Sequence, residues 1–305
     1  MYEIPDTRFF PDERFTVVEC DNCGLGFVNP RPTFAEMSKY YPTNYYSASP
    51  PSGLRDYLAR RTVAQARYLR RIEKQSGPGR LLDVGCGNGY FLRFMHARGW
   101  DVAGVEISEN AAPLDDIPVY PQEFQNIPVS QPTYDAVTAW AVLEHVHDPM
   151  AYFRKAAQVT KKGGHFIFLV TNFHSMASRY LFGEDVPRHL YFFTRETVRQ
   201  YLEKSGFALE SEDNGRSIYK MAPPNWITFL VQTRLRGKPF TYEDAPLSSR
   251  EFRRAHGLSK GIAASLKYLA YSPTSVLERV LLPVVETVQI LRRTYGISTY
   301  IARKS

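Results

Sequence analysis

Cysteine is scarce in this chain, and long apolar runs are missing. Three cysteines among 305 residues cannot build the disulfide framework that stabilises many small secreted domains. The opening residues, MYEIPDTRFFPDERF, contain no apolar stretch of the kind that a secretory signal peptide needs. No segment approaches the roughly 18 consecutive apolar residues of a transmembrane helix. We therefore expect a cytoplasmic protein in which nothing spans a membrane.

Acidic residues are few in the last third of the sequence. Residues 214–305 contain 15 Lys and Arg against 5 Asp and Glu, whereas residues 1–213 contain 23 against 26. The net charge of +7 therefore belongs to the last third. Such a local excess suits contact with an anionic group, for example a phosphorylated substrate, lipid head groups or a polyanion. A well-solvated surface would have the same composition, so both interpretations stay open.

The first 53 residues are rich in proline and aromatic residues and show little periodicity. We predict an irregular N-terminal arm over residues 1–53, with one short helix near Phe34–Tyr40. Cys20 and Cys23 are spaced like one knuckle of a zinc ribbon, but a closed structural zinc site needs four ligands. The third cysteine, Cys86, lies far away in another motif, so no bound metal is expected.

Strand and helix patterns alternate over residues 54–213. Alternation of this kind predicts parallel strands joined by right-handed crossovers, which is a doubly wound α/β fold. A helix is expected first, over Leu54–Ile72. Seven strands in all make a mainly parallel sheet, the last of them in a terminal segment, 297–305. The expected strands are Arg80–Val84, Asp101–Val105, Val119–Tyr120, Ala136–Trp140, Phe166–Val170, Phe207–Ser211 and Ser298–Ala302, and the expected helices between them are Gly89–Arg98, Pro149–Thr160 and Arg195–Ser205.

Residues 214–296 form a basic helical insertion before the last strand. Amphipathic patterns predict helices near Trp226–Leu235 and Ile262–Arg293, with a break about Ser272 and a second interruption at Pro283. Apolar residues beside cations suit a membrane-surface helix or a lid over an apolar, phosphorylated acceptor. They suit a dimer interface or a lid that packs on the core equally well.

The most specific motif is LLDVGCGNGYFL, residues 81–92. A buried strand ends at Val84, and three glycines follow before a helix. Glycine is required where the backbone turns with positive φ or where a ligand lies against the main chain. Glu106 ends the next strand, at a position where a carboxylate can accept both hydroxyls of a ribose. The absence of a Lys-Ser/Thr ending argues against a phosphate-binding loop.

This combination resembles the class I S-adenosylmethionine-dependent methyltransferases. The segments YDAVTAWAVLEHVHDP, KKGGHFIFLV and HLYFFTRETVRQYLEKSGF also look like parts of that Rossmann-like fold. The resemblance implies S-adenosylmethionine as cofactor, with Asp83 organising the loop, Glu106 on the ribose and Ile107 on the adenine. The remaining cofactor-binding residues that it implies are Gly85, Cys86, Gly87, Gly89, Glu123, Phe124, Trp140 and Ala141. Tyr40, Tyr41, Tyr45 and Tyr46 resemble a segment that folds over the cofactor in such enzymes.

LEHVHDP further resembles the subgroup of ubiquinone-biosynthesis and sugar or natural-product O-methyltransferases. An acceptor hydroxyl must lose a proton, and a His or carboxylate within reach can take it. His145 is the first candidate, His189 the second, and Glu144 stands beside His145. Glu144 and His145 could instead form a helix-capping pair that supports the cofactor wall. The subgroup's E-x-x-E-H metal pattern lacks its first Glu, because Ala141 stands there, so no metal is predicted.

The resemblance implies methyl transfer to a hydroxyl of a small molecule, such as a sugar, lipid-linked or natural-product acceptor, with an anionic acceptor allowed by the basic insertion. Peripheral membrane contact is compatible with this reading, and the protein would be a monomer or a homodimer. Alternatives are a nucleic-acid or protein methyltransferase and a non-catalytic cofactor-binding module. No nucleic-acid partner is expected, because the position after the fourth strand reads TAWAVLEH rather than an N/D-P-P-aromatic motif.

Overall fold

The structure is a computed structural model of the 305-residue chain. It describes residues 2–5, 10, 12–41, 52–108, 114, 116–179, 185–215, 218, 226–231, 235, 252–253 and 255–305. The predictions about Tyr45 and Tyr46, and the middle of the insertion at residues 236–250, lie outside the described residues.

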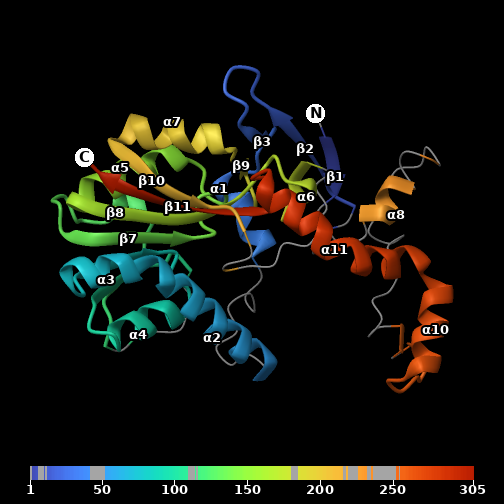
Figure 1. Ribbon diagram of the computed structural model, residues 1–305. Helices are drawn as coiled ribbons and strands as arrows, with labels where there is room; N and C mark the ends of the chain where they lie inside the picture. The colour runs from blue at the N-terminus through green and yellow to red at the C-terminus, as the bar shows by residue number, and fades with distance from the viewer. Residues whose placement is uncertain are drawn as a thin grey trace.

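A seven-stranded sheet forms the centre of the molecule (Figure 1). Its strand order is β10-β11-β8-β7-β4-β5-β6. The strands β4 to β8 pair in parallel, whereas β11 is antiparallel to both β8 and β10. The bounds are β4 Arg80–Val84, β5 Asp101–Val105, β6 Val119–Tyr120, β7 Tyr134–Trp140, β8 Thr160–Thr171, β10 Phe207–Asp213 and β11 Ile297–Lys304. The predicted fold class is therefore confirmed, with all seven strands at their expected places.

Helices cover both faces of this sheet (Figure 1). One face carries α5 (Pro149–Val159) and α7 (Arg195–Ser205), and the other carries α2 (Ser52–Ala66), α3 (Arg70–Ser76) and α4 (Tyr90–His96). The 3-10 turn η2 (Arg67–Leu69) joins α2 to α3. Local sequence sets the helix starts, because Asp148 and Thr194 accept hydrogen bonds from the first-turn amides of α5 and α7.

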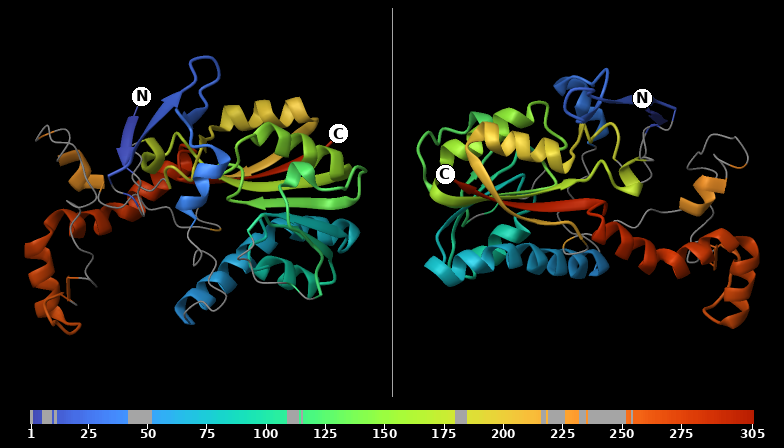
Figure 2. Two further views of the ribbon diagram at one scale, coloured as in Figure 1. Left: turned by 180° about the vertical axis from the view of Figure 1, so that it is seen from behind. Right: turned by 45° about the horizontal axis from the view of Figure 1, so that its top comes forward.

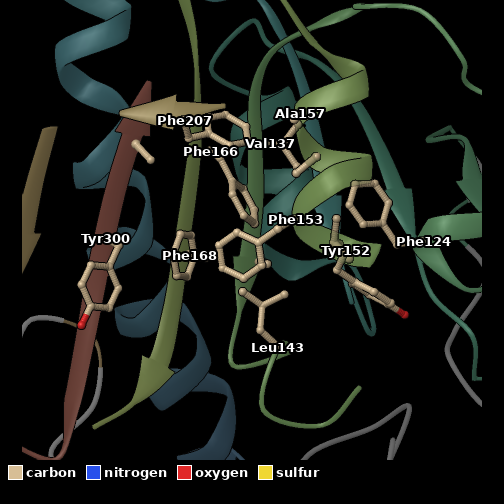
Figure 3. Close-up of a cluster of buried hydrophobic side chains, with 14 of the residues drawn as sticks. Phe124, Val137, Leu143, Tyr152, Phe153, Ala157, Phe166, Phe168, Phe207 and Tyr300 are labelled. Atoms are coloured by element: carbon tan, nitrogen blue, oxygen red, sulfur yellow. The ribbon is translucent and has the colours of Figure 1, made fainter. Parts of the chain in front are cut away.

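Aromatic residues fill the core between the sheet and the α5 layer (Figure 3). Phe153 of α5 is fully buried and meets Phe166 and Phe168 of β8 edge-on, at centroid distances of 5.5 and 5.2 Å. Phe168 in turn stacks on Tyr300 of β11 at 5.3 Å. These contacts join the parallel strands to the antiparallel strand β11, so the C-terminal segment is an integral part of the core.

The prediction of an irregular arm is wrong, because the arm contains a second sheet. The strands β1 (Tyr2–Pro5), β2 (Arg14–Glu19) and β3 (Gly26–Val28) pair antiparallel in sequence order. β3 also pairs with β9 (Tyr191–Phe192), which lies far along the chain. The expected short helix is present as α1 (Phe34–Met37) and the 3-10 turn η1 (Ser38–Tyr40). A three-residue strand has little pattern of its own, and its distant partner supplies the stabilising pairing.

The insertion leads away from the central sheet (Figure 2). It contains α8 (Trp226–Leu230), α10 (Ile262–Tyr271) and α11 (Pro273–Leu291). The expected break at Ser272 is present, but the interruption expected at Pro283 is not, since α11 continues through this residue. The short helix α6 (Met176–Arg179) lies near the inner end of α11, where Gln289 accepts a hydrogen bond from the Met176 amide. Among the described helices, none is both long and apolar enough to cross a bilayer.

Candidate active site

A cavity of about 440 Å³ opens at the carboxyl ends of β4, β5 and β7. Open α/β sheets bind their ligands at this edge. The connections that follow two neighbouring strands run to opposite faces of the sheet, and a crevice remains between them. The lining from the central sheet and its following loops is Val84, Gly85, Val105, Glu106, Ile107, Ser108, Glu123, Phe124, Ala141, Val142, His145, Val146 and His147, with Tyr152 from α5. The N-terminal arm adds Phe34, Met37, Ser38 and Tyr41.

The glycine loop adopts the backbone that its sequence predicts. Gly85, Gly87 and Gly89 all have positive φ, at 68°, 52° and 69°, a region that residues with side chains rarely adopt. At Gly85 a Cβ would also lie 2.6 Å from a methyl carbon of Val142. Glycine therefore lets the Val142 side chain pack directly against the loop at the cavity wall, whereas Gly87 and Gly89 shape the turn and do not line the cavity.

Glu106 is connected to the glycine loop. Its Oε2 accepts a hydrogen bond from the Gly87 amide at 2.9 Å, and its Oε1 accepts one from the Ser108 amide at 2.9 Å. The side chain is buried, yet it lines the cavity. A carboxylate oxygen has two lone pairs, so each oxygen can still accept a hydrogen bond from a ligand hydroxyl. The two amides thus hold the carboxylate in a fixed orientation at the cavity wall.

Asp83 and Cys86 lie beneath the loop and do not line the cavity. Asp83 is buried, and its Oδ1 accepts a hydrogen bond from the Thr138 hydroxyl at 2.6 Å. Burial raises the pKa of Asp83 to about 7, and nearby Glu106 acts in the same direction. Burial likewise raises the pKa of the Cys86 thiol, so Cys86 is present as a neutral thiol packed under the turn. The arrangement is compatible with Asp83 as an organiser of the loop.

The raised pKa of Asp83 predicts how stability depends on pH. Between about pH 4 and pH 7 the native state keeps this proton while the unfolded state loses it, so stability falls as pH rises. The full difference is at most about 4 kcal/mol. Asp83→Asn should remove this slope in urea unfolding at pH 5 and pH 8, whereas the exposed control Asp101→Asn should keep it. Equal slopes in Asp83→Asn and the wild type would contradict the assignment.

The other residues expected around a nucleoside divide into two groups. Ile107, Glu123 and Phe124 line the cavity, and Phe124 begins a 3-10 turn, η3 (Phe124–Asn126), after β6. Ala141 also lines it and has a φ of 59°, an unusual backbone for a residue with a Cβ. Trp140 does not line it, because its ring packs behind the sheet against Phe91 and Tyr68 on the α4 side.

His145, His189 and Glu144 are brought together after β7. The imidazole rings of His145 and His189 lie 4.6 Å apart in an edge-on arrangement. His145 Nδ1 is 3.0 Å from the Arg188 carbonyl and 3.2 Å from the Tyr41 hydroxyl. A carbonyl can only accept, so Nδ1 carries the proton and Nε2 is the basic nitrogen. Burial lowers the pKa of His145 to about 3, with His189 acting in the same direction, so His145 is neutral at pH 7.

These three residues also have the chemistry of a metal site. Each offers one ligand atom, and these atoms lie within 4.8 Å of one another. Imidazole and carboxylate ligands together suit zinc and other divalent transition metals. Of the three, only His145 lines the cavity, while Glu144 and His189 are buried behind it. The same geometry therefore suits either a proton-accepting histidine with supporting neighbours or a divalent cation.

Sequence reasoning missed most of the contribution of the N-terminal arm. Phe34, Met37 and Ser38 line the cavity, and so does Tyr41, whereas Tyr40 is buried beneath it. A capping box in which Thr33 and Glu36 bond reciprocally fixes the start of α1. That box was the available local signal for a short helix. The position of α1 beside the cavity depends on tertiary contacts, which no local sequence pattern indicates.

Buried Arg188 connects the arm to the histidines. Its side chain is fully buried, pairs with Asp185, and donates a hydrogen bond to the Tyr40 carbonyl at 3.2 Å. Its own carbonyl faces His145. His147 was not among the predicted site residues, but it also lines the cavity, and its Nε2 is 3.0 Å from the Pro32 carbonyl. The arm and the loop after β7 thus form one wall.

Comparison with known proteins gives the family. The family model described as a methyltransferase domain matches residues 56–212, which is more than half of the chain, so the chain belongs to that family. It is 36% identical over 103 residues to the ubiquinone biosynthesis O-methyltransferase of Alkalilimnicola ehrlichii, covering 30% of this chain and 42% of that protein. It is 34% identical over 106 residues to the enzyme of the same name from Acinetobacter baylyi, covering 30% and 44%. The chain thus spans less than half of the length of these relatives.

Solved structures give a similar comparison at lower identity. A SAM-dependent methyltransferase from Archaeoglobus fulgidus is 20% identical, with a TM-score of 0.48 and coverage of 80% of this chain and 94% of that one. Geranyl diphosphate C-methyltransferase from Streptomyces coelicolor is 14% identical, with a TM-score of 0.48 and coverage of 80% and 79%.

Proposed function

We propose that this protein is an enzyme that transfers a methyl group from S-adenosylmethionine to a hydroxyl of a small molecule. The observation that carries the proposal is the placement of Glu106. Its carboxylate lines the cavity while two backbone amides, one of them in the glycine loop, hold it in place. The related ubiquinone biosynthesis O-methyltransferases support the choice of a hydroxyl acceptor.

The cavity residues fit the cofactor. A ribose would lie at Glu106, which has acceptor capacity for both hydroxyls, and the adenine would lie among Ile107, Glu123 and Phe124. The methionine part would cross the loop at Gly85, which lines the cavity with backbone alone. When bound, S-adenosylmethionine supplies an electrophilic methyl group on a sulfonium. The chain's own contribution is alignment and exclusion of water, which in favourable cases are together worth about 7–11 kcal/mol.

The acceptor would enter beside His145 and the N-terminal arm. Phe34, Met37 and Tyr41 provide an apolar and aromatic wall next to that histidine. His145 Nδ1 is held by the Arg188 carbonyl, which leaves Nε2 as the nitrogen that would accept the proton of an acceptor hydroxyl. His189 supports this ring or takes the proton itself. We propose Glu144 as the residue that positions the pair.

We propose a small acceptor and no nucleic acid, because the relatives that the chain resembles are ubiquinone biosynthesis O-methyltransferases and the wall beside His145 is apolar and aromatic. The basic insertion favours an anionic or lipid-linked acceptor. We further propose that the protein works in the cytoplasm as a monomer or homodimer.

Isothermal titration calorimetry with S-adenosylmethionine and S-adenosylhomocysteine tests the cofactor directly. We expect saturable binding of both at micromolar to low millimolar concentration. Mass spectrometry of S-adenosylhomocysteine release, with catechols and hydroxylated lipid precursors as acceptors, then tests the reaction. Failure to bind either nucleoside at millimolar concentration would reject the proposal, whereas binding without turnover would leave a cofactor-binding module.

Chelation tests the role of the Glu144, His145 and His189 cluster. We propose a metal-independent transfer, because alignment and a neutral histidine supply what the step needs. Turnover after dialysis against EDTA should equal that of the untreated enzyme. Loss of turnover that magnesium, manganese or zinc restores would instead assign these three residues to a divalent cation.

A further inference from the structure

The helix α11 is amphipathic in the opposite sense from an ordinary surface helix. Its buried residues are polar or charged, namely Ser275, Glu278, Glu286 and Gln289. Five of its large apolar residues are 43–78% exposed, namely Leu277, Val280, Val284, Val288 and Leu291. A surface helix normally turns its apolar stripe to the core. The apolar residues of α11 therefore form an outward-facing stripe, hereafter the α11 stripe.

The spacing shows that this stripe is one continuous face. Steps of three and four residues connect Leu277 to Leu291, so these side chains lie one above another along the helix. Ser275, Glu278, Glu286 and Gln289 are each displaced by two positions from a stripe residue, which is roughly 200° around a helix of 3.6 residues per turn. The two sets thus occupy opposite sides of α11.

Hydrogen bonds explain why the polar side faces inward. Glu278 Oε1 accepts hydrogen bonds from the Ile227 and Thr228 amides of α8, at 2.7 and 3.1 Å. Gln289 accepts one from the Met176 amide at 3.2 Å, and Glu286 lies 3.4 Å from the Tyr295 hydroxyl. Buried polar groups need such partners. These contacts fix the rotation of α11, so the outward stripe follows from the way the helix is attached.

The preceding helix also exposes apolar residues. In α10, Ile262, Leu266 and Leu269 follow helical spacing and are exposed, while Ala264 and Tyr268 on the other side are buried. Both helices lie in the part of the molecule that projects from the central sheet (Figures 1 and 2). A patch of this length on a protein surface marks an interaction site.

The charges beside the stripe have one sign. Within residues 255–296, the carboxylates of Glu278 and Glu286 are buried, whereas Lys260, Lys267 and Arg292 are exposed. An exposed apolar helix face with cations beside it has the composition of a helix that lies in a membrane interface and contacts anionic lipids. The charges are therefore complementary to anionic head groups.

We propose that α10 and α11 dock the protein on an anionic membrane surface, with the α11 stripe inserted between head groups. A second copy of the chain is a less suitable partner for the α11 stripe. A two-fold interface places the same patch against itself and would bring the exposed Lys and Arg side chains beside the stripe close together. The proposal does not include a helix that crosses the bilayer, since none of the described helices is both long and apolar enough to do so. The inference does not depend on methyl transfer, and vesicle binding can be measured without cofactor or acceptor.

Vesicle cosedimentation of the full chain tests the proposal. We expect binding to vesicles that contain phosphatidylglycerol, and little binding to pure phosphatidylcholine vesicles. The double variant Val280→Asp and Val284→Asp should reduce partitioning at least tenfold. The control is Val63→Asp, which makes the same substitution once at an exposed valine of α2 and should bind like the wild type; the single variant Val280→Asp, of equal charge, should bind more weakly than this control. Circular dichroism melting would verify that all variants are folded.

A second variant tests the electrostatic part. Reversal of Lys267 and Arg292 to Glu should weaken binding to phosphatidylglycerol vesicles at least roughly 30-fold, because each basic residue near an anionic surface contributes about a fivefold factor. Absence of wild-type cosedimentation, or equal binding by the stripe variant, would overturn the proposal. Concentration-dependent dimerisation in analytical ultracentrifugation, abolished by the stripe variant without any vesicle binding, would assign the stripe to a second copy instead.

Discussion

Replacement of Glu106 by alanine should weaken S-adenosylmethionine binding by about 3–6 kcal/mol, or about two to four orders of magnitude. The estimate assumes two lost hydrogen bonds to ribose hydroxyls, each charge-assisted and worth about 1.5–3 kcal/mol. The variant also loses the acceptors for the Gly87 and Ser108 amides, so the loop loses its connection to the end of β5. Calorimetry measures the affinity, and urea unfolding measures the separate cost to stability.

Two further variants test whether the loss of affinity comes from the Glu106 carboxylate itself. Glu106→Gln keeps one carbonyl acceptor and should lose an intermediate amount of affinity. Asp101→Ala removes a carboxylate from the opposite end of the same strand, where it is exposed and pairs with Arg80 at 2.8 Å. This control should bind like the wild type. If Glu106→Ala bound S-adenosylmethionine normally, Glu106 would not belong to the cofactor site.

Replacement of His145 by alanine should lower the turnover number by about two to four orders of magnitude, the usual contribution of a general base. Affinity for S-adenosylmethionine should stay within about twofold, because the expected nucleoside contacts are made by other residues. Single-turnover and steady-state rates with an accepted hydroxyl substrate separate these effects. The exposed residue His174 provides the control, and His174→Ala should retain full turnover.

Variants of His189 distinguish which of the two histidines accepts the proton. If His189 accepts the proton, His189→Ala should lose turnover to the same extent while His145→Ala loses little. If both act as a unit, the double variant should be no slower than the slower single variant. Normal turnover in both single variants would remove the pair from the mechanism and leave alignment as the protein's contribution.

Much of the fold was predictable because parallel strands have strong local patterns. A strand covered on both faces appears as a short continuous apolar run, and β4 and β5 have the predicted bounds. Sharp turns also leave a local signal, since Gly85, Gly87 and Gly89 have the expected positive φ. For the same reason the position of Glu106 at a strand end could be inferred before its contacts were known.

Other features depend on partners that are distant in sequence. β3 has three residues and pairs with β9 more than a hundred residues later, so the arm looked irregular. Trp140 was expected at the cavity, but as the last residue of β7 it faces the α4 side, where Phe91 and Tyr68 surround it. A strand alternates its faces, and a displacement by one residue exchanges them.

The sequence by itself determined the α/β class, the order of the core strands, the glycine turn and the carboxylate that follows it. These features follow from local burial periodicity and from backbone angles that glycine alone adopts easily. Only the tertiary structure decided that Phe34, Met37 and Ser38 of the arm line the cavity, that His145 meets His189, and that α11 turns its apolar side outward. Each depends on hydrogen bonds between segments far apart, such as Arg188 with Tyr40 and Glu278 with Ile227, whose pairing no local pattern encodes.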